Sequence, residues 1–143
     1  MAESNQHLRL VRSILAYVRQ EFGNIEALAL FDDTAEPVRG EKPPLINGHV
    51  PDVYATDSPP TITIIGEAKT QKDLETERSR EQIGCFLDHL AVHPNGVFVL
   101  AVPLAAAATA RGMVKMLLGE RPSALIRVVV LDGLAPAGGR PPC

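Results

Sequence analysis

The stretch TITIIGEAK, residues 61–69, decides the fold. Its first five residues are all Thr or Ile, β-branched residues that favour strands. Side chains in a strand alternate between its two faces, so Glu67 and Lys69 share one face while Ala68 points to the other. We therefore expect a buried strand that presents a carboxylate and an amine together at its end.

A turn and a second strand precede this stretch. Residues 57–60, Asp-Ser-Pro-Pro, are typical of a turn, and residues 49–55 are interpreted as a short strand. Folding the hairpin about this turn puts Asp52 opposite residues 65–67, and Cβ atoms directly opposite each other on paired strands are ~5 Å apart. Asp52 and Glu67 then converge at one edge of the sheet. A register shifted by one residue would send Asp52 to the opposite face.

The rest of the chain alternates helices with strands. Helices are expected at 6–22, 71–91 and 104–118, and strands at 25–31, 97–102 and 125–131. The sequence of residues 25–31 would suit a helix equally. The last two strands are apolar except at Arg127, which is typical of strands covered on both faces, and the helix between them implies parallel pairing. The order predicts an α/β fold with a mixed central β-sheet flanked by helices.

Length and composition point to a single domain. The 143 residues fit one compact unit, residues 1–131, and residues 132–143 are rich in Gly and Pro and are expected to form a flexible C-terminal tail. The formal charge of −3 argues against a protein that binds nucleic acid by bulk charge. No apolar run approaches the ~20 residues that span a bilayer, and the first residues lack the features of a signal peptide. We expect a cytoplasmic protein without a membrane partner.

The two carboxylates suggest a metal site. Two converging carboxylates with no thiolate and no paired imidazole beside them make an oxygen-rich site of the kind that binds Mg²⁺ or Mn²⁺. Beside such a metal, Lys69 is a compact cation that can hold a phosphate oxygen or a nucleophilic water. These parts fit metal-assisted hydrolysis of a phosphodiester. The alternative is a solvated strand end with a cross-strand ion pair, which contributes little.

The same residues carry a family resemblance. Pro51-Asp52, followed at a hairpin's distance by Glu67-Ala68-Lys69, resembles the PD-(D/E)xK nuclease superfamily, also called the restriction-endonuclease-like fold. The αβββαβ core of that family matches the expected order of elements. The resemblance implies that Asp52 and Glu67 bind the metal with help from the backbone carbonyl of Ala68. It also implies that Lys69 orients or activates the water.

The resemblance covers roughly residues 5–131 and implies two further site residues. Gln82, in Gln-Ile-Gly-Cys-Phe, resembles the Gln-x-x-x-Tyr of many members, with Phe86 in place of the Tyr. The alternative for Gln82 is an exposed helix residue. Many members also supply a Glu from the first helix, for which Glu21 is the best-placed residue and Glu26 the second. The alternative for Glu21 is a solvent-facing residue at a helix end.

Together these features predict a Mg²⁺- or Mn²⁺-dependent deoxyribonuclease that works as a homodimer or within a larger complex. Arg78 and Arg80 lie in a segment dense in charges of both signs. They could contact DNA phosphates, or they could belong to a solvated helix face with i, i+4 pairs. The alternative function is a catalytically silent domain of the same fold, acting as a binding or assembly module in a nucleic-acid-processing or defence complex.

Overall fold

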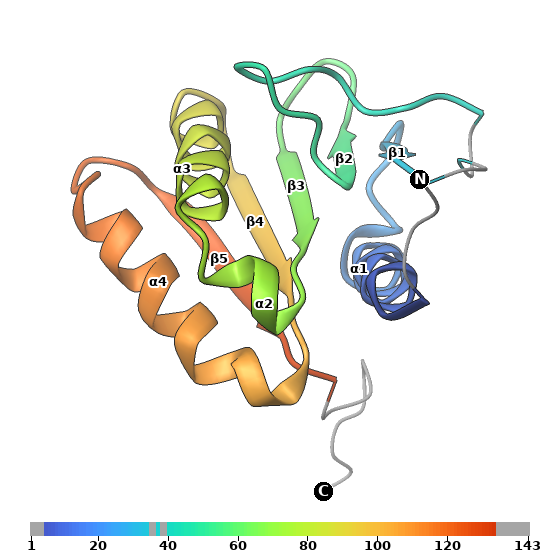
Figure 1. The fold of residues 1–143 in the computed structure, drawn as a ribbon. Helices are drawn as coiled ribbons and strands as arrows, with labels where there is room; N and C mark the ends of the chain where they lie inside the picture. The colour runs from blue at the N-terminus through green and yellow to red at the C-terminus, as the bar shows by residue number, and fades with distance from the viewer. Residues whose placement is uncertain (1–4, 35–36, 38–39, 134–143) are drawn as a thin grey trace, which may run out of the picture.

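The computed structural model describes residues 5–34, 37 and 40–133 (Figure 1). Its elements alternate much as the sequence predicts. In chain order they are α1 (Asn5–Phe22), β1 (Ala29–Asp32), β2 (Val53–Thr56), β3 (Thr63–Ala68), α2 (Gln71–Leu74), α3 (Glu77–Ala91), β4 (Gly96–Ala101), the 3-10 helix η1 (Leu104–Ala106), α4 (Ala107–Gly119) and β5 (Ile126–Leu131).

The strands form one five-stranded sheet in the order β1-β2-β3-β4-β5. β1 with β2 and β2 with β3 are antiparallel, whereas β3 with β4 and β4 with β5 are parallel. The predicted α/β class, with a mixed sheet between helices, is confirmed. The more specific assignment to the restriction-endonuclease-like fold stays a prediction.

Helices cover both faces of the sheet (Figure 1). The buried apolar stripe of α1, which includes Ile14, packs on one face of the sheet, and α3 and α4 pack on the other. α1 comes unusually close to β3 because residue 66 is a glycine. A Cβ added at Gly66 would lie 2.5 Å from Cγ2 of Ile14 and 3.2 Å from Cβ of Val53. The position of α1 is therefore fixed against the backbone of the strand that carries Glu67.

The structure corrects several predicted boundaries. The single helix expected at 71–91 is two helices, because the side chain of Thr70 caps α2 and that of Thr76 starts α3 by accepting from the N–H of Ser79. The strand expected at 49–55 begins only at Val53. Before it, Ile46 and His49 form an isolated bridge across Asn47-Gly48.

β5 also departs from expectation. Its sequence, IRVVVL, is apolar apart from Arg127 and predicted burial on both faces. The strand instead lies at the edge of the sheet, and its residues are only partly buried or, at Arg127, exposed. Most of the predicted tail, residues 134–143, lies outside the described residues. Within the described part of the chain, no helix has the length and apolar character needed to cross a bilayer.

Candidate active site

Asp52 and Glu67 lie side by side where β2 and β3 meet. The register pairs Val53 with Gly66, so its continuation sets Asp52 opposite Glu67. The backbone N–H of Asp52 donates to Oε1 of Glu67 at 3.2 Å, and the N–H of Ala68 donates to Oδ2 of Asp52 at 2.8 Å. Asp52 is 8% exposed and Glu67 is 4% exposed. The structure thus brings together the two carboxylates that the hairpin predicted and buries both.

Lys69 and Gln82 complete the predicted group. Nζ of Lys69 lies 3.3 Å from Oε2 of Glu67 and donates to Oε1 of Gln82 at 2.5 Å. The backbone N–H of Lys69 donates to the carbonyl of Ala101, which fixes the end of β3 beside β4. Gln82 comes from α3 and is half-buried, so it holds the lysine from the helical layer. The ammonium group is therefore positioned by two acceptors from different elements.

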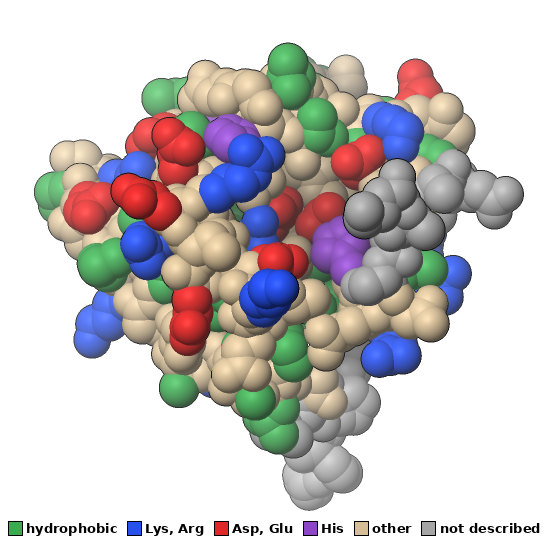
Figure 2. Space-filling model, in the orientation of Figure 1, with side chains coloured by type: hydrophobic (Ala, Val, Ile, Leu, Met, Phe, Trp, Pro, Cys, Tyr) green, Lys and Arg blue, Asp and Glu red, His purple; other side chains and the backbone are tan. Residues whose placement is uncertain are grey.

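His7 joins the cluster and was not predicted. Its Nε2 lies 3.3 Å from Oδ2 of Asp52, within hydrogen-bond or ion-pair distance. The sequence holds a signal for this contact, since His7 lies four residues before Val11 and seven before Ile14. It therefore extends the buried stripe of α1 toward the sheet. Figure 2 shows acidic, basic and histidine side chains gathered around a recess in the middle of one face.

Glu21 and Glu26 do not reach this cluster. Glu21 follows His7 by fourteen residues on the same helix, which at 1.5 Å per residue separates them by about 21 Å along the axis. Glu21 is exposed and lies near Tyr17, whose pKa is raised by burial first and by the Glu21 carboxylate in addition. Glu26 is exposed in the segment after that same far end of α1. The structure therefore does not bring Glu21 or Glu26 to the cluster, because the end of α1 near the cluster is its N-terminal end, and the solvent-facing alternative for Glu21 describes its position.

Burial and charge change the acidity of Glu67. Its pKa rises from the ordinary 4.5 to about 8, chiefly because burial disfavours the charged carboxylate and then because the Asp52 carboxylate repels it. Lys69 and the N–H of Asp52 offset part of this rise. A carboxylate in such surroundings at neutral pH is stabilised by a proton or by a cation between it and Asp52.

The chemistry of the donors suits a hard divalent cation. Two carboxylates, a backbone carbonyl and water are the ligands that Mg²⁺ and Mn²⁺ accept. Ala68, whose carbonyl the family resemblance implicates, lies between Glu67 and Lys69 and is buried. Among residues 5–34, 37 and 40–133, no three His, Cys, Asp or Glu side chains converge as a ready metal site. Two carboxylates would therefore hold the cation, with backbone and water in its remaining positions.

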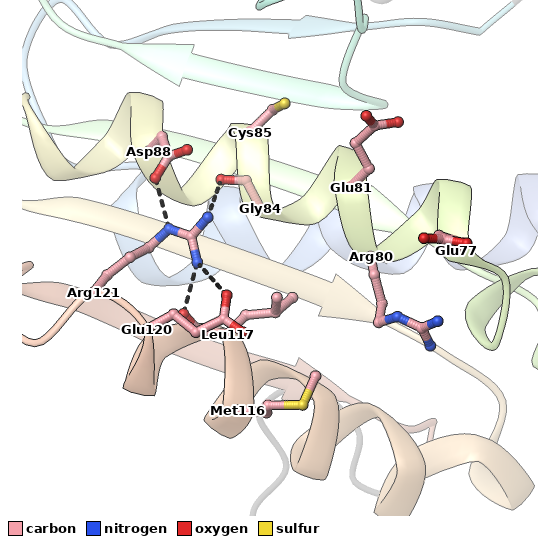
Figure 3. Close-up of a pocket in the computed structure, with 10 residues that line it drawn as sticks. All are labelled: Glu77, Arg80, Glu81, Gly84, Cys85, Asp88, Met116, Leu117, Glu120 and Arg121. Carbon is pink, nitrogen blue, oxygen red and sulfur yellow. Dashed lines mark hydrogen bonds and ion pairs between the residues drawn. The ribbon is translucent and has the colours of Figure 1, made fainter.

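The two candidate DNA-binding arginines point in different directions. Arg78 is exposed and lies four residues before Gln82, so it shares a side of α3 with the cluster. Arg80 lies instead in a cleft of about 450 Å³ between α3 and α4. Figure 3 shows it there, extending toward α4. Of the two, only Arg78 is placed beside the candidate site.

The same cleft holds an arginine that joins α3 to α4 (Figure 3). The guanidinium of Arg121 donates to Oδ1 of Asp88 at 2.6 Å, to the carbonyl of Leu117 at 2.7 Å and to the carbonyl of Gly84 at 3.3 Å. A Cβ at residue 84 would lie 3.1 Å from Nη2 of Arg121. Arg121 therefore stabilises the contact between these two helices, and the absence of a side chain at Gly84 leaves room for it.

Comparison of the chain with protein-family models, with curated proteins and with solved structures found no match. The case for a function therefore rests on the geometry and chemistry of the cluster itself. The resemblance to the PD-(D/E)xK nucleases stays a prediction from the residues that carry it.

Proposed function

We propose that this chain is a metal-dependent nuclease that hydrolyses phosphodiester bonds in DNA. The observation that carries the proposal is the buried Asp52–Glu67 pair with Lys69 held beside it by Gln82. Two adjacent buried carboxylates are costly unless a proton or a cation compensates them, so a structural role alone gives a poor account of the pair. A surface ion pair of Glu67 and Lys69 would need neither the burial nor Asp52.

Each residue has a distinct task in this proposal. When bound, Mg²⁺ or Mn²⁺ would lower the pKa of a water and neutralise charge on the phosphate. Asp52 and Glu67 would hold the cation, and His7 would fix the orientation of the Asp52 carboxylate. Lys69 has two acceptors and a third N–H left over, which suits it to hold a phosphate oxygen or the attacking water.

Cleavage assays on the purified full chain test this function. Supercoiled plasmid, linear duplex, branched and single-stranded DNA, and an RNA oligonucleotide are each incubated with Mg²⁺, with Mn²⁺ and with EDTA. We expect DNA cleavage that requires the metal and that falls about 100-fold or more in Lys69→Ala. Lys72→Ala, a change to an exposed lysine of α2, is the matched control and should cleave like the wild type.

Metal binding is measured separately by calorimetry with Mn²⁺. Asp52→Asn should lose binding, while Asp88→Asn, which alters an exposed aspartate paired with Arg121 and away from the cluster, should keep it. Cleavage that is unchanged in Lys69→Ala would contradict the proposed site. If the wild type binds metal but cuts none of the substrates, the silent binding or assembly module becomes the better account.

A further inference from the structure

The two edges of the sheet are protected to different degrees. β1 has four residues and ends at Asp32, a carboxylate that is 1% exposed. Short edge strands and inward-pointing charges are two ways in which proteins prevent further strand pairing. β5 has six residues, five of them apolar, and it pairs with β4 in an unbroken register without a bulge or a proline. By the same criteria, β5 is the unprotected edge.

The hydrogen bonding of β5 alternates between its two sides. The carbonyl of Leu131 accepts from the N–H of Val102 at 2.9 Å, on the side of β4. In an extended strand the N–H and C=O of one residue point to the same side and those of the next point to the other. The backbone groups of Ile126, Val128 and Val130 therefore point away from the sheet. Among the described residues, no backbone group outside the sheet pairs with them.

A groove runs along this edge on the face covered by α4. Its volume is about 320 Å³, and its lining residues are Arg111, Val114, Lys115, Leu118, Val128 and Val130. The two valines of β5 that line it are residues whose N–H and C=O point outward. A strand added at this edge would thus find backbone partners and an apolar groove at the same positions.

The charged residues that line the groove indicate which kind of polypeptide segment would bind there. Nη2 of Arg111 already lies 3.1 Å from Oδ2 of Asp132, whereas Lys115 is exposed and has no ion-pair partner within the described part of the chain. A second copy paired through β5 would bring its own α4 alongside and set the cations of the two copies against each other. A segment with an acidic side chain would instead meet Lys115 with opposite charge.

We propose that β5 is a docking edge for an extended, acidic segment of a partner protein, which adds a sixth strand and places alternate apolar side chains in the groove beside α4. This inference does not depend on the proposed nuclease activity. It would give the chain a route into the larger complex that is expected from the sequence.

Amide hydrogen exchange on the full chain tests the edge first. In the free protein, the amides of residues 127, 129 and 131 should be protected by pairing with β4, while those of residues 126, 128 and 130 exchange fast. Protection of all six would mean that this edge is already covered and would overturn the proposal. A dimer that persists on size exclusion with light scattering, and that Val128→Lys disrupts, would replace the partner segment by a second copy.

Peptide binding tests whether an extended, acidic segment pairs with β5. The probe is a capped eight-residue peptide of alternating valine and threonine with a glutamate at each end. It should slow exchange at residues 128 and 130 about tenfold and leave residue 129 unchanged. The same peptide with alternate N-methyl groups, which removes its donors, should not bind, nor should its lysine counterpart. Lys115→Glu should reverse the preference between the two charged peptides, and Lys72→Glu should not. Equal binding of the N-methylated or the lysine peptide to the wild type would refute the proposal.

Discussion

Replacing Glu67 by glutamine tests how much the buried Glu67 carboxylate destabilises the metal-free fold and whether that carboxylate binds the metal. Glutamine has nearly the same shape and keeps a carbonyl oxygen that can accept from the N–H of Asp52, now 3.2 Å from Oε1. It carries no charge, so it removes both the repulsion from Asp52 and the attraction to Lys69. In the absence of metal, we expect Glu67→Gln to stabilise the fold near neutral pH.

The size of the effect follows from the pKa of Glu67, which is about 8 in the folded chain against an ordinary value of 4.5. Between these two values the folded protein keeps a proton that the unfolded chain has released, so stability falls as pH rises. The slope is about 1.4 kcal/mol per pH unit, which at pH 7 amounts to about 3 kcal/mol relative to low pH. Below pH 4.5 Glu67 causes no loss of stability, and above pH 8 the loss no longer changes with pH.

Urea unfolding measures this dependence. Wild type and Glu67→Gln are unfolded in EDTA at pH values from 5 to 9, with Glu26→Gln as a matched change at an exposed glutamate. The free energy of unfolding of the wild type and of Glu26→Gln should fall from pH 5 to pH 8, whereas that of Glu67→Gln should be nearly flat. Added Mg²⁺ should then stabilise the wild type, by about 2.7 kcal/mol at a hundred times Kd, and leave Glu67→Gln unchanged.

Three results would refute this reasoning. A wild type whose stability does not change between pH 5 and pH 8 would mean that Glu67 is ionised in the folded chain at little cost. A Glu67→Gln variant that retains the full slope would assign the dependence to another group. A Mg²⁺ response that survives in the variant would remove Glu67 from the metal site.

Three further changes test individual contacts. Gln82→Ala removes the acceptor at 2.5 Å from Nζ of Lys69, so DNA cleavage should fall about 10- to 100-fold, and Gln82→Glu should restore part of it because a carboxylate also accepts. Arg121→Ala breaks the contacts between α3 and α4 and should lower the free energy of unfolding by about 2 kcal/mol in urea, against about 0.5 kcal/mol or less for the exposed Arg78→Ala. His7→Ala should lower the affinity for Mn²⁺ about tenfold by calorimetry, and an unchanged affinity would leave His7 with a packing role only.

Residue types and turn signals predicted the strands and the hairpin that form between segments close in sequence. The β-branched run before Glu67 and the turn at 57–60 specified the central hairpin, and largely apolar stretches predicted β4 and β5. The break between α2 and α3 was missed because two helices and one long helix share the same apolar stripe there. Only the capping of α3 by Thr76 distinguishes them. The exposure of β5 was missed because sheet order is a property of the whole chain.

The site was predictable to the extent that it lies within one hairpin and the next helix. Asp52, Glu67, Lys69 and Gln82 are all brought together by pairings between neighbouring elements. His7 comes from an element forty-five residues away from Asp52, and its contact depends on which end of α1 faces the end of β3. Residue spacing along α1 cannot give that direction, which is why the sequence offered Glu21, at the other end of the helix, and did not offer His7.

Gly66, the residue before Glu67, couples the packing of α1 on the sheet to the geometry of the candidate site. On one side of β3, Gly66 is the surface on which α1 rests, and the next residue on the other side is the carboxylate of the candidate site. Substituting position 66 would displace α1 and, with it, the imidazole that touches Asp52. The chain therefore has little freedom to adjust its helical layer and its charged cluster separately. Evolutionary or engineered change in one must be matched by change in the other.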